Sequence, residues 1–243
     1  FSNIPNSGLI GVEKEPYADT MLCPNSKKAI LRSCGAGIAA ADDLIKKNER
    51  VFCAIRPPGH HAETTKAMGF CFINNIAVTA QYLQNKYKVN KIAIIDFDVH
   101  HGNGTQEIFY NDETVLYASS HEFPLFPGTG SEQEIGVGNI FNAPLKTGMK
   151  GNEFLKIFDQ KILRPIDKFK PEIILISAGF DAHVRDPLAN INLESEDFYQ
   201  ITKQIVDLAN IHSKGRVISF LEGGYDLLAL SESIKQHLLA LKN

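Results

Sequence analysis

Five short hydrophobic runs, each rich in β-branched or aromatic residues, recur along the chain. They are almost continuously apolar and do not alternate with polar positions, a pattern typical of parallel strands that are covered on both faces. We therefore predict five strands, at residues 51–55, 91–95, 114–118, 173–176 and 216–220.

Segments between these runs have the three-and-four spacing of amphipathic helices. The first helix is predicted to follow Pro24, with Asn25 or Ser26 as its cap. Its predicted buried face consists of Ile30, Leu31, Cys34, Ile38, Ala41 and Ile45. Further helices are predicted at 73–87, 151–163, 195–212 and 227–241. Alternating strands and helices indicate an α/β fold, with a mostly parallel sheet and helices on both faces.

No repeat, low-complexity tract or linker divides the chain of 243 residues, so we predict a single domain over residues 1–243. Residues 121–150 interrupt the alternation, because they contain prolines and glycines and few helix-forming residues. A loop of this length without structure of its own is usually functional or disordered, and its aromatic residues argue against disorder.

Composition and charge exclude several classes of protein. Hydrophobic residues make up 44% of the chain, which excludes an intrinsically disordered protein. The 25 basic and 28 acidic side chains give a net charge of −3, so no basic field for direct nucleic-acid binding exists. No run of about 18 apolar residues is present, so no membrane span is predicted. Without a signal peptide, we expect a cytoplasmic protein, or a nuclear one in a eukaryote.

Several well-known functional motifs are absent or incomplete in the sequence. The four cysteines form no CxxC pair, which indicates free thiols in a reducing compartment and no structural zinc knuckle. Gly102-Asn103-Gly104 follows a predicted strand, but Glu107 stands where a dinucleotide fingerprint needs glycine. There is no P-loop, and the serines at 119–120 lack the Gly-x-Ser-x-Gly elbow of serine hydrolases.

Each predicted strand is followed directly by a cluster of polar side chains, at the end where parallel strands form a shared crevice. Six of the eight histidines lie in these clusters, and packing alone does not explain that distribution. They are His60, His61, His100, His101, His121 and His183. The other two, His212 and His237, are predicted on helix faces turned toward solvent.

A metal site is indicated by the spacing of Asp98 and His100, whose side chains point to the same side of an extended segment. Asp181 follows a different strand and reaches the same crevice. Two carboxylates and one imidazole suit a single zinc ion with an open fourth position for water. For either aspartate alone, the alternative is a helix cap or an ion-pair partner.

The adjacent residues His60 and His61 can supply the base that a zinc-bound water requires. Gly59 permits a sharp turn that presents both rings. Asp96 has the same strand parity as Asp98 and is the best candidate to orient His60. Two structural histidines are the alternative.

Tyr225 follows two glycines, which let its ring project into the crevice, where the phenol can donate to a developing oxyanion. A buried tyrosine with a backbone partner is the alternative. Glu222 can rival the aspartates as a metal ligand, but its position at a strand end favours a side chain that faces a helix.

Taken together, these residues resemble the zinc-dependent histone deacetylase superfamily, which includes acetylpolyamine amidohydrolases and shares the arginase-like α/β fold. Any one motif is a weak signal, whereas the whole set is specific and follows the family's order. The matching stretches are 19–20, 56–62, 69–71, 96–104, 126–130, 178–183 and 222–225.

The resemblance implies one zinc ion per chain, bound by the two aspartates and the histidine of the predicted metal site. His60 and His61 would be the acid/base pair, and Tyr225 would polarise the acetyl carbonyl and steady the oxyanion.

The resemblance also implies a narrow channel for an acylated alkylamine, lined by Gly69, Phe70 and Phe126. A structural potassium ion is implied at side chains or carbonyls of Asp96, Asp98, His100, Ser119 and Ser120. On weaker matching, a second monovalent site is implied near Phe109, Asp112 and Val115.

Two positions and one stretch show how closely the chain follows the family pattern. Asn103 stands where one branch has an aspartate behind the second histidine; this resembles the class II branch and should leave His61 more easily neutral. Tyr225 is present where some members carry histidine, so we expect activity. The family's amino-terminal stretch, with an early strand and an acidic residue on a rim loop, is expected to be missing, which leaves the substrate preference open.

We therefore expect a zinc-dependent amidohydrolase that removes acetyl groups from the lysines of histones or other proteins, or from acetylpolyamines. One alternative is an arginase-like binuclear manganese hydrolase, which would have the order Asp-x-His-x-Asp where this chain has Asp96, Asp98 and His100. The other is an inactive module that binds acetyl-lysine. The oligomeric state stays open.

Overall fold

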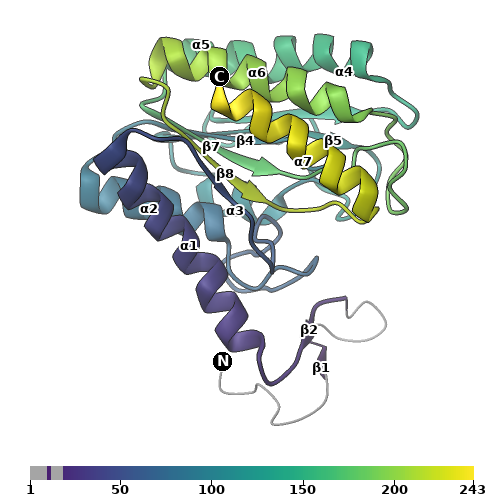
Figure 1. Ribbon diagram of the computed structural model, residues 1–243, viewed down its shortest axis with the longest axis horizontal. Helices are drawn as coiled ribbons and strands as arrows, with labels where there is room; N and C mark the ends of the chain where they lie inside the picture. Colours follow the sequence, from purple (N-terminus) through teal and green to yellow (C-terminus); the bar gives the residue numbers. More distant parts are fainter. Residues whose placement is uncertain (1–9, 12–18) are drawn as a thin grey trace.

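Six parallel strands form one sheet in the order β3-β8-β7-β4-β5-β6 (Figure 1). The structure is a computed structural model that describes residues 10–11 and 19–243. The strands of the sheet are β3 (Val51–Cys53), β4 (Ile92–Asp96), β5 (Val115–Glu122), β6 (Ile140–Leu145), β7 (Ile173–Ala178) and β8 (Val217–Leu221). A separate antiparallel pair consists of β1 (Ile10–Gly11) and β2 (Met21–Leu22).

Helices cover both faces of this sheet, as Figure 1 shows. One face carries α1 (Ser26–Lys47), α2 (Asn75–Tyr87) and α3 (Asn103–Phe109). The other carries α4 (Gly151–Ile157), the π-helical turn η1 (Phe158–Leu163), α5 (Arg164–Phe169), α6 (Ser195–His212) and α7 (Leu227–Lys242). The arrangement confirms the predicted α/β fold.

The central strand β4 supplies alternate residues to two separate hydrophobic cores. Ile92 and Ile94 pack under α1 and α2, whereas Ala93 and Ile95 pack under the layer formed by α4 to α7. Each fully buried aliphatic side chain contributes about 1.5–3 kcal/mol. Because both faces are covered, the strand has no polar alternation, and its carboxyl end is a rigid support for the residues that follow.

The five predicted strands are present, with ends that shift by up to four residues. The prediction of an unstructured segment at 121–150 is wrong in part, because it contains β6 and the last two residues of β5. Asn142 and Pro144 interrupt the apolar pattern of β6. A proline is tolerated there because β6 is an edge strand of the sheet.

Two helix predictions need correction. The helix predicted to end at residue 163 continues through α5 to Phe169, because Pro165 lies in the first turn of α5, where its missing N–H is tolerated. Leu31 was expected on the buried face of α1, but its side chain is 50% exposed. Asn25 is the N-cap of α1, although its side chain makes no capping hydrogen bond.

The prediction that His237 faces solvent is wrong, because α7 packs against α6 and buries the ring completely. Its Nδ1 lies 2.6 Å from Thr202 Oγ1 and its Nε2 lies 2.9 Å from Ser219 Oγ. His212 is half-buried and contacts the Asp167 carboxylate.

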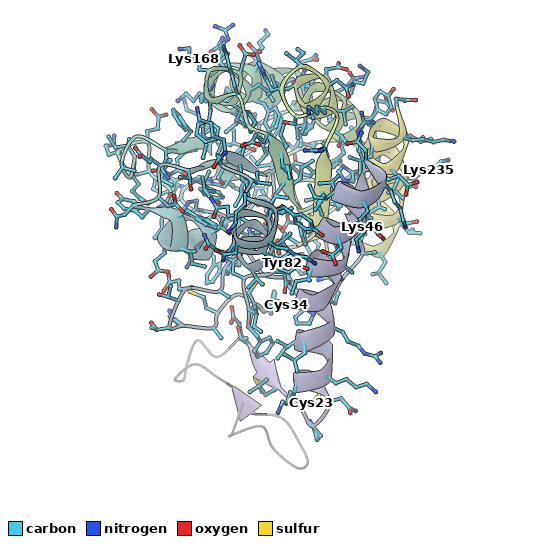
Figure 2. All side chains as sticks on the ribbon, turned by 90° about the vertical axis from the view of Figure 1, so that its left-hand side faces the viewer. Cys23, Cys34, Lys46, Tyr82, Lys168 and Lys235 are labelled. Carbon is cyan, nitrogen blue, oxygen red and sulfur yellow. The ribbon has the colours of Figure 1, made fainter. Side chains whose placement is uncertain are left out.

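All four cysteines have free thiols, as predicted. Figure 2 shows Cys23 near the start of α1 and Cys34 farther along that helix. Cys53 and Cys71 are buried, and burial raises the pKa of the Cys53 thiol to about 12. None of the helices in the described part of the chain has the length and apolar character to cross a membrane.

Candidate active site

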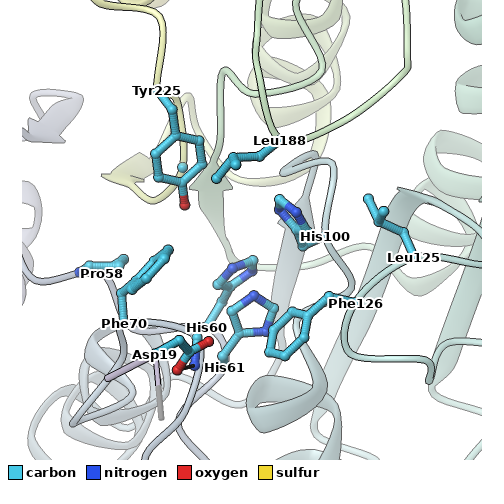
Figure 3. A pocket seen from close by; sticks show the side chains of 12 residues that line it. Asp19, Pro58, His60, His61, Phe70, His100, Leu125, Phe126, Leu188 and Tyr225 are labelled. Carbon is cyan, nitrogen blue, oxygen red and sulfur yellow. Dashed lines mark hydrogen bonds between the residues drawn. The ribbon is translucent and has the colours of Figure 1, made fainter. Parts of the chain in front are cut away.

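A pocket of about 210 Å³ opens at the carboxyl ends of the central strands (Figure 3). We call the buried group at its deep end the floor: His60, His61, His100 and Gly223 line the pocket there, and Asp98 and Asp181 cluster with His100. We call its outer edge the rim, which consists of Asp19, Pro58, Phe70, Leu125, Phe126 and Leu188.

The three predicted metal ligands converge on the floor. The ligand atoms of Asp98, His100 and Asp181 lie within 4.8 Å of one another, and all three residues are buried. His100 Nδ1 lies 3.2 Å from Asp98 Oδ1 and 3.0 Å from Asp181 Oδ2. Burial alone lowers the pKa of His100, but the two carboxylates outweigh it and raise that pKa to about 11. The cluster therefore concentrates negative charge where a cation would neutralise it.

Backbone contacts fix the two carboxylates from separate strands. Val99 N donates to Asp181 Oδ1 at 2.9 Å, and Gly223 N donates to Asp98 Oδ2 at 2.8 Å. A Cβ atom on Gly179 would lie 2.1 Å from Asp98 Oδ2, and one on Gly223 would lie 2.2 Å from Asp181 Oδ2. The two glycines therefore leave room for the carboxylates, and this donor set fits one divalent cation such as zinc.

His60 lies against Asp96, as the strand parity predicts. Its Nδ1 is 3.0 Å from Asp96 Oδ2, which also accepts a hydrogen bond from the Tyr117 hydroxyl. Burial alone lowers the pKa of His60, but the carboxylates of Asp96 and Asp98 outweigh it and raise that pKa to about 10. The His60 ring is therefore held in one orientation and favours the charged form.

His61 has a neutral partner instead. Its Nδ1 lies 2.8 Å from Asn103 Oδ1, while Asn103 Nδ2 donates to Glu63 Oε1 at 2.6 Å. The amide oxygen of Asn103 thus faces the ring, so Nδ1 carries the proton and Nε2 is left as an acceptor. Burial, together with the neighbouring His60, lowers the pKa of His61 well below its usual value.

The ring of Tyr225 projects into the pocket, and Figure 3 shows its hydroxyl pointing inward. Gly224, with φ +130°, turns the chain before it, and Tyr225 N donates to Asp186 Oδ2 at 2.8 Å. Burial raises the pKa of the phenol above its usual value, so the hydroxyl stays protonated and can donate a hydrogen bond.

Comparison with known proteins identifies the family. A sequence profile described as "Histone deacetylase domain" matches residues 3–241. The chain belongs to the histone deacetylase family. It is 40% identical over 244 residues to histone deacetylase 10, chloroplastic, of Oryza sativa subsp. japonica, covering 96% of this chain and 55% of the rice protein.

One further relative and one solved structure support the same family membership. A probable deacetylase of Archaeoglobus fulgidus is 42% identical over 204 residues, which cover 82% of this chain and 56% of that protein. The crystal structure of the HDA15 HD domain superposes with a TM-score of 0.88 at 35% identity, covering 93% of this chain and 65% of the other. The chain spans little more than half the length of the first curated relatives that it matches.

The expectation that Glu222 faces a helix is wrong, because its carboxylate contacts the backbone at Gly59, and Glu222 is not part of the cluster of three candidate metal ligands. Glu222 Oε2 accepts hydrogen bonds from Gly59 N at 2.7 Å and His60 N at 3.2 Å, and Ser177 Oγ donates to Oε1 at 3.0 Å. It therefore ties the end of β8 to the turn that carries the two histidines.

The rim of the pocket contains two residues to which the sequence assigned no role. The expectation that an acidic rim residue is missing is wrong: Asp19 lines the pocket, and its Oδ1 accepts hydrogen bonds from Gly69 N at 3.2 Å and Thr20 Oγ1 at 2.7 Å. Leu188, which is 47% exposed, also lines the pocket, and its side chain points toward that of Tyr225 (Figure 3). A single leucine in a loop has no pattern that marks it as functional.

The predicted channel residues Gly69, Phe70 and Phe126 all line the pocket. Gly69 has φ +55°, and a Cβ atom there would lie 2.3 Å from the His61 ring, so glycine is required beside the floor.

The residues predicted for the family's structural potassium lie next to each other, since Asp96 and Ser119 are register partners in β4 and β5. The Ser119 hydroxyl contacts His121 Nδ1 at 2.9 Å. The Ser120 hydroxyl is buried without a hydrogen-bond partner. These contacts are compatible with an oxygen-ligated cation beside the floor, and the potassium ion stays a prediction.

Proposed function

We propose that the protein is a zinc-dependent deacetylase that hydrolyses N-acetyl amides. The observation that carries the proposal is the convergence of Asp98, His100 and Asp181 beside two histidines and a phenol in one pocket. Bound zinc would supply Lewis-acid activation of the acetyl carbonyl and of a water molecule. The family membership supports this chemistry.

The chain's own side chains can perform the remaining steps. The neutral His61 Nε2 accepts a proton from the attacking water and returns it to the leaving amine. His60, held charged by Asp96, stabilises negative charge on the floor. The Tyr225 hydroxyl donates to the acetyl oxygen as charge develops there, and this hydrogen bond strengthens in the transition state.

The rim favours acetyl-lysine in a peptide over an acetylated polyamine. Phe70, Phe126 and Leu188 present apolar surface to the alkyl chain of the substrate, and all are between 40% and 47% exposed. Asp19 is the single carboxylate among the rim residues, and two hydrogen bonds already occupy its Oδ1. A polyamine would bring further ammonium groups against apolar side chains, and their desolvation would oppose binding.

Turnover by the zinc-loaded protein tests this proposal. We expect kcat/KM for acetyl-lysine peptides to exceed that for acetylated polyamines by about tenfold or more, and a chelator to abolish both. A higher rate with polyamines would reject the substrate assignment. No turnover of either substrate with zinc bound would reject the deacetylase and favour the inactive binding module.

Metal counting separates the arginase-like alternative. A single cluster of three ligands is found among the described residues, and His183 stands where a second aspartate would follow Asp181. We therefore expect one zinc ion per chain. Two manganese ions per active chain would instead support the binuclear hydrolase.

A further inference from the structure

Outside the pocket, three main-chain carbonyl groups converge on one point between the end of α3 and the start of β6. They belong to Phe109, Asp112 and Val115, the residues that resemble the family's second monovalent cation site. The Asn139 side chain lies at that point: its Nδ2 is 2.8 Å from Phe109 O, 3.0 Å from Asp112 O and 2.9 Å from Val115 O. We infer that the Asn139 amide replaces the second cation in this protein.

The three carbonyls are brought together by the local backbone. Asp112 N donates to Phe109 O and Val115 N donates to Asp112 O, each at 3.1 Å. These two successive hydrogen bonds, each spanning three residues, direct the carbonyls to the same side of the turn. The amide has two N–H groups for three acceptors, so one N–H is shared between two carbonyls. The turn therefore needs no ion to satisfy these oxygens.

The orientation of the amide is fixed from both ends. Asn139 Oδ1 accepts a hydrogen bond from Val137 N at 3.2 Å, and rotating the amide by half a turn would place Oδ1 against three carbonyl oxygens. Gly136 has φ +58°, and a Cβ atom there would lie 2.6 Å from Asn139 Oδ1. The backbone at Gly136 thus leaves the space that the side chain of Asn139 uses.

A cation bound by the same three oxygens would require the position that Nδ2 fills. Asn139 is only 5% exposed, so its displaced N–H groups would stay buried without partners, which is unfavourable. One carboxylate oxygen of the turn is also engaged, because Asp112 Oδ1 accepts hydrogen bonds from Thr114 N and Thr114 Oγ1. A neutral amide therefore suits this niche better than an ion does.

Counting rubidium, a substitute for potassium, tests the inference without any measurement of turnover. Equilibrium dialysis is carried out on the wild-type protein, on Asn139→Ala, and on the control Asn152→Ala, which removes an exposed amide from α4. We expect Asn139→Ala to bind one rubidium ion per chain more than the other two proteins. Equal counts for all three would overturn the inference.

Thermal unfolding gives a second measurement. Replacing tetramethylammonium chloride with potassium chloride at constant ionic strength should raise the Tm of Asn139→Ala by about 4 °C more than that of the wild type. The same Tm response in both proteins would contradict the replacement.

If Asn139→Ala does not fold, the wild-type protein alone decides. Anomalous diffraction from its crystals grown in rubidium chloride should show no peak among the carbonyls of Phe109, Asp112 and Val115. A rubidium peak at that point would show that the ion displaces the amide, and would overturn the inference.

Discussion

The floor and the rim of the same pocket are built in different ways. On the floor, His60 and Asp98 are at most 3% exposed, and backbone N–H groups or carboxylates hold each of them. On the rim, Phe70, Phe126 and Leu188 come from loops and are 40% to 47% exposed. The floor is thus fixed by several contacts per group, whereas the rim residues are bounded by solvent on one side.

This difference separates chemistry from selectivity. A fixed set of charges and donors needs no rearrangement during reaction, which is the condition for strong transition-state stabilisation. Exposed apolar side chains can be exchanged at low cost in stability, because surface substitutions usually change it by less than about 0.5 kcal/mol. Substitutions on the floor should therefore affect kcat, and substitutions on the rim should affect KM and substrate preference.

The largest effect is expected for Asp181→Asn. An amide supplies a weaker ligand and removes one negative charge from the metal cluster, so zinc content and kcat/KM should both fall, the latter by about 10³-fold or more. Metal analysis with turnover checks this, and Asp159→Asn on the surface is the control. Full zinc content and activity in Asp181→Asn would contradict the assignment of Asp181 as a metal ligand.

Tyr225→Phe should lower kcat by about 10²-fold or more, because the lost hydroxyl donates mainly in the transition state. Zinc content and KM should stay close to those of the wild type. The exposed Tyr110→Phe serves as the control. An unchanged kcat in Tyr225→Phe would show that the phenol does not take part in the reaction.

Glu222→Gln should lower kcat by about tenfold, equivalent to about 1.4 kcal/mol, with little change in KM. The amide NH₂ cannot accept a hydrogen bond, so the contact with Gly59 N or with Ser177 Oγ is weakened and the turn that carries His60 shifts. Glu232→Gln on the surface of α7 is the matched control. A change in KM alone would show that Glu222 belongs functionally to the rim.

On the rim, Leu188→Glu should lower KM for acetylated polyamines by about fivefold and leave kcat unchanged. A partly exposed ion pair contributes at most about 1 kcal/mol, which sets the size of this effect. Steady-state kinetics with both substrate classes checks it, and Ile211→Glu on α6 is the control. A tenfold loss of kcat in Leu188→Glu would contradict the assignment of the rim to KM and substrate preference.

The last prediction concerns stability in acid and tests a histidine whose pKa is shifted by burial, without a carboxylate contact. Burial lowers the pKa of His237 to about 3, so this histidine stays neutral in the folded protein below pH 6.5, where the unfolded chain takes up a proton. The free energy of unfolding should therefore decrease as the pH is lowered from 6.5 to 3. This residue contributes up to about 1.4 kcal/mol of that decrease per pH unit.

Urea unfolding at pH 7, 6 and 5 measures this dependence. The change in unfolding free energy per pH unit should be smaller in His237→Gln than in the wild type, by the equivalent of about one proton. Equal slopes for His237→Gln and the wild type would show that the His237 ring is protonated in the folded state.

The sequence by itself determined the strands, and it brought out the candidate metal ligands and the two adjacent histidines, which follow the carboxyl ends of those strands. These features are local: a run such as 91–95 must be buried on both faces, and the spacing of Asp98 and His100 places both side chains on one side of an extended segment. Parallel strands then bring their carboxyl ends to one edge of the sheet, so the site follows from short patterns and a general rule of topology.

Only the tertiary structure decided which distant groups meet. Glu222 reaches Gly59 across 163 positions, and the amide of Asn139 reaches three carbonyls of another turn. His237 looks like a surface residue on its own helix and is buried by the helix packed against it. Such contacts depend on how whole elements pack, which is a property of the assembled layers and is not encoded in any local spacing.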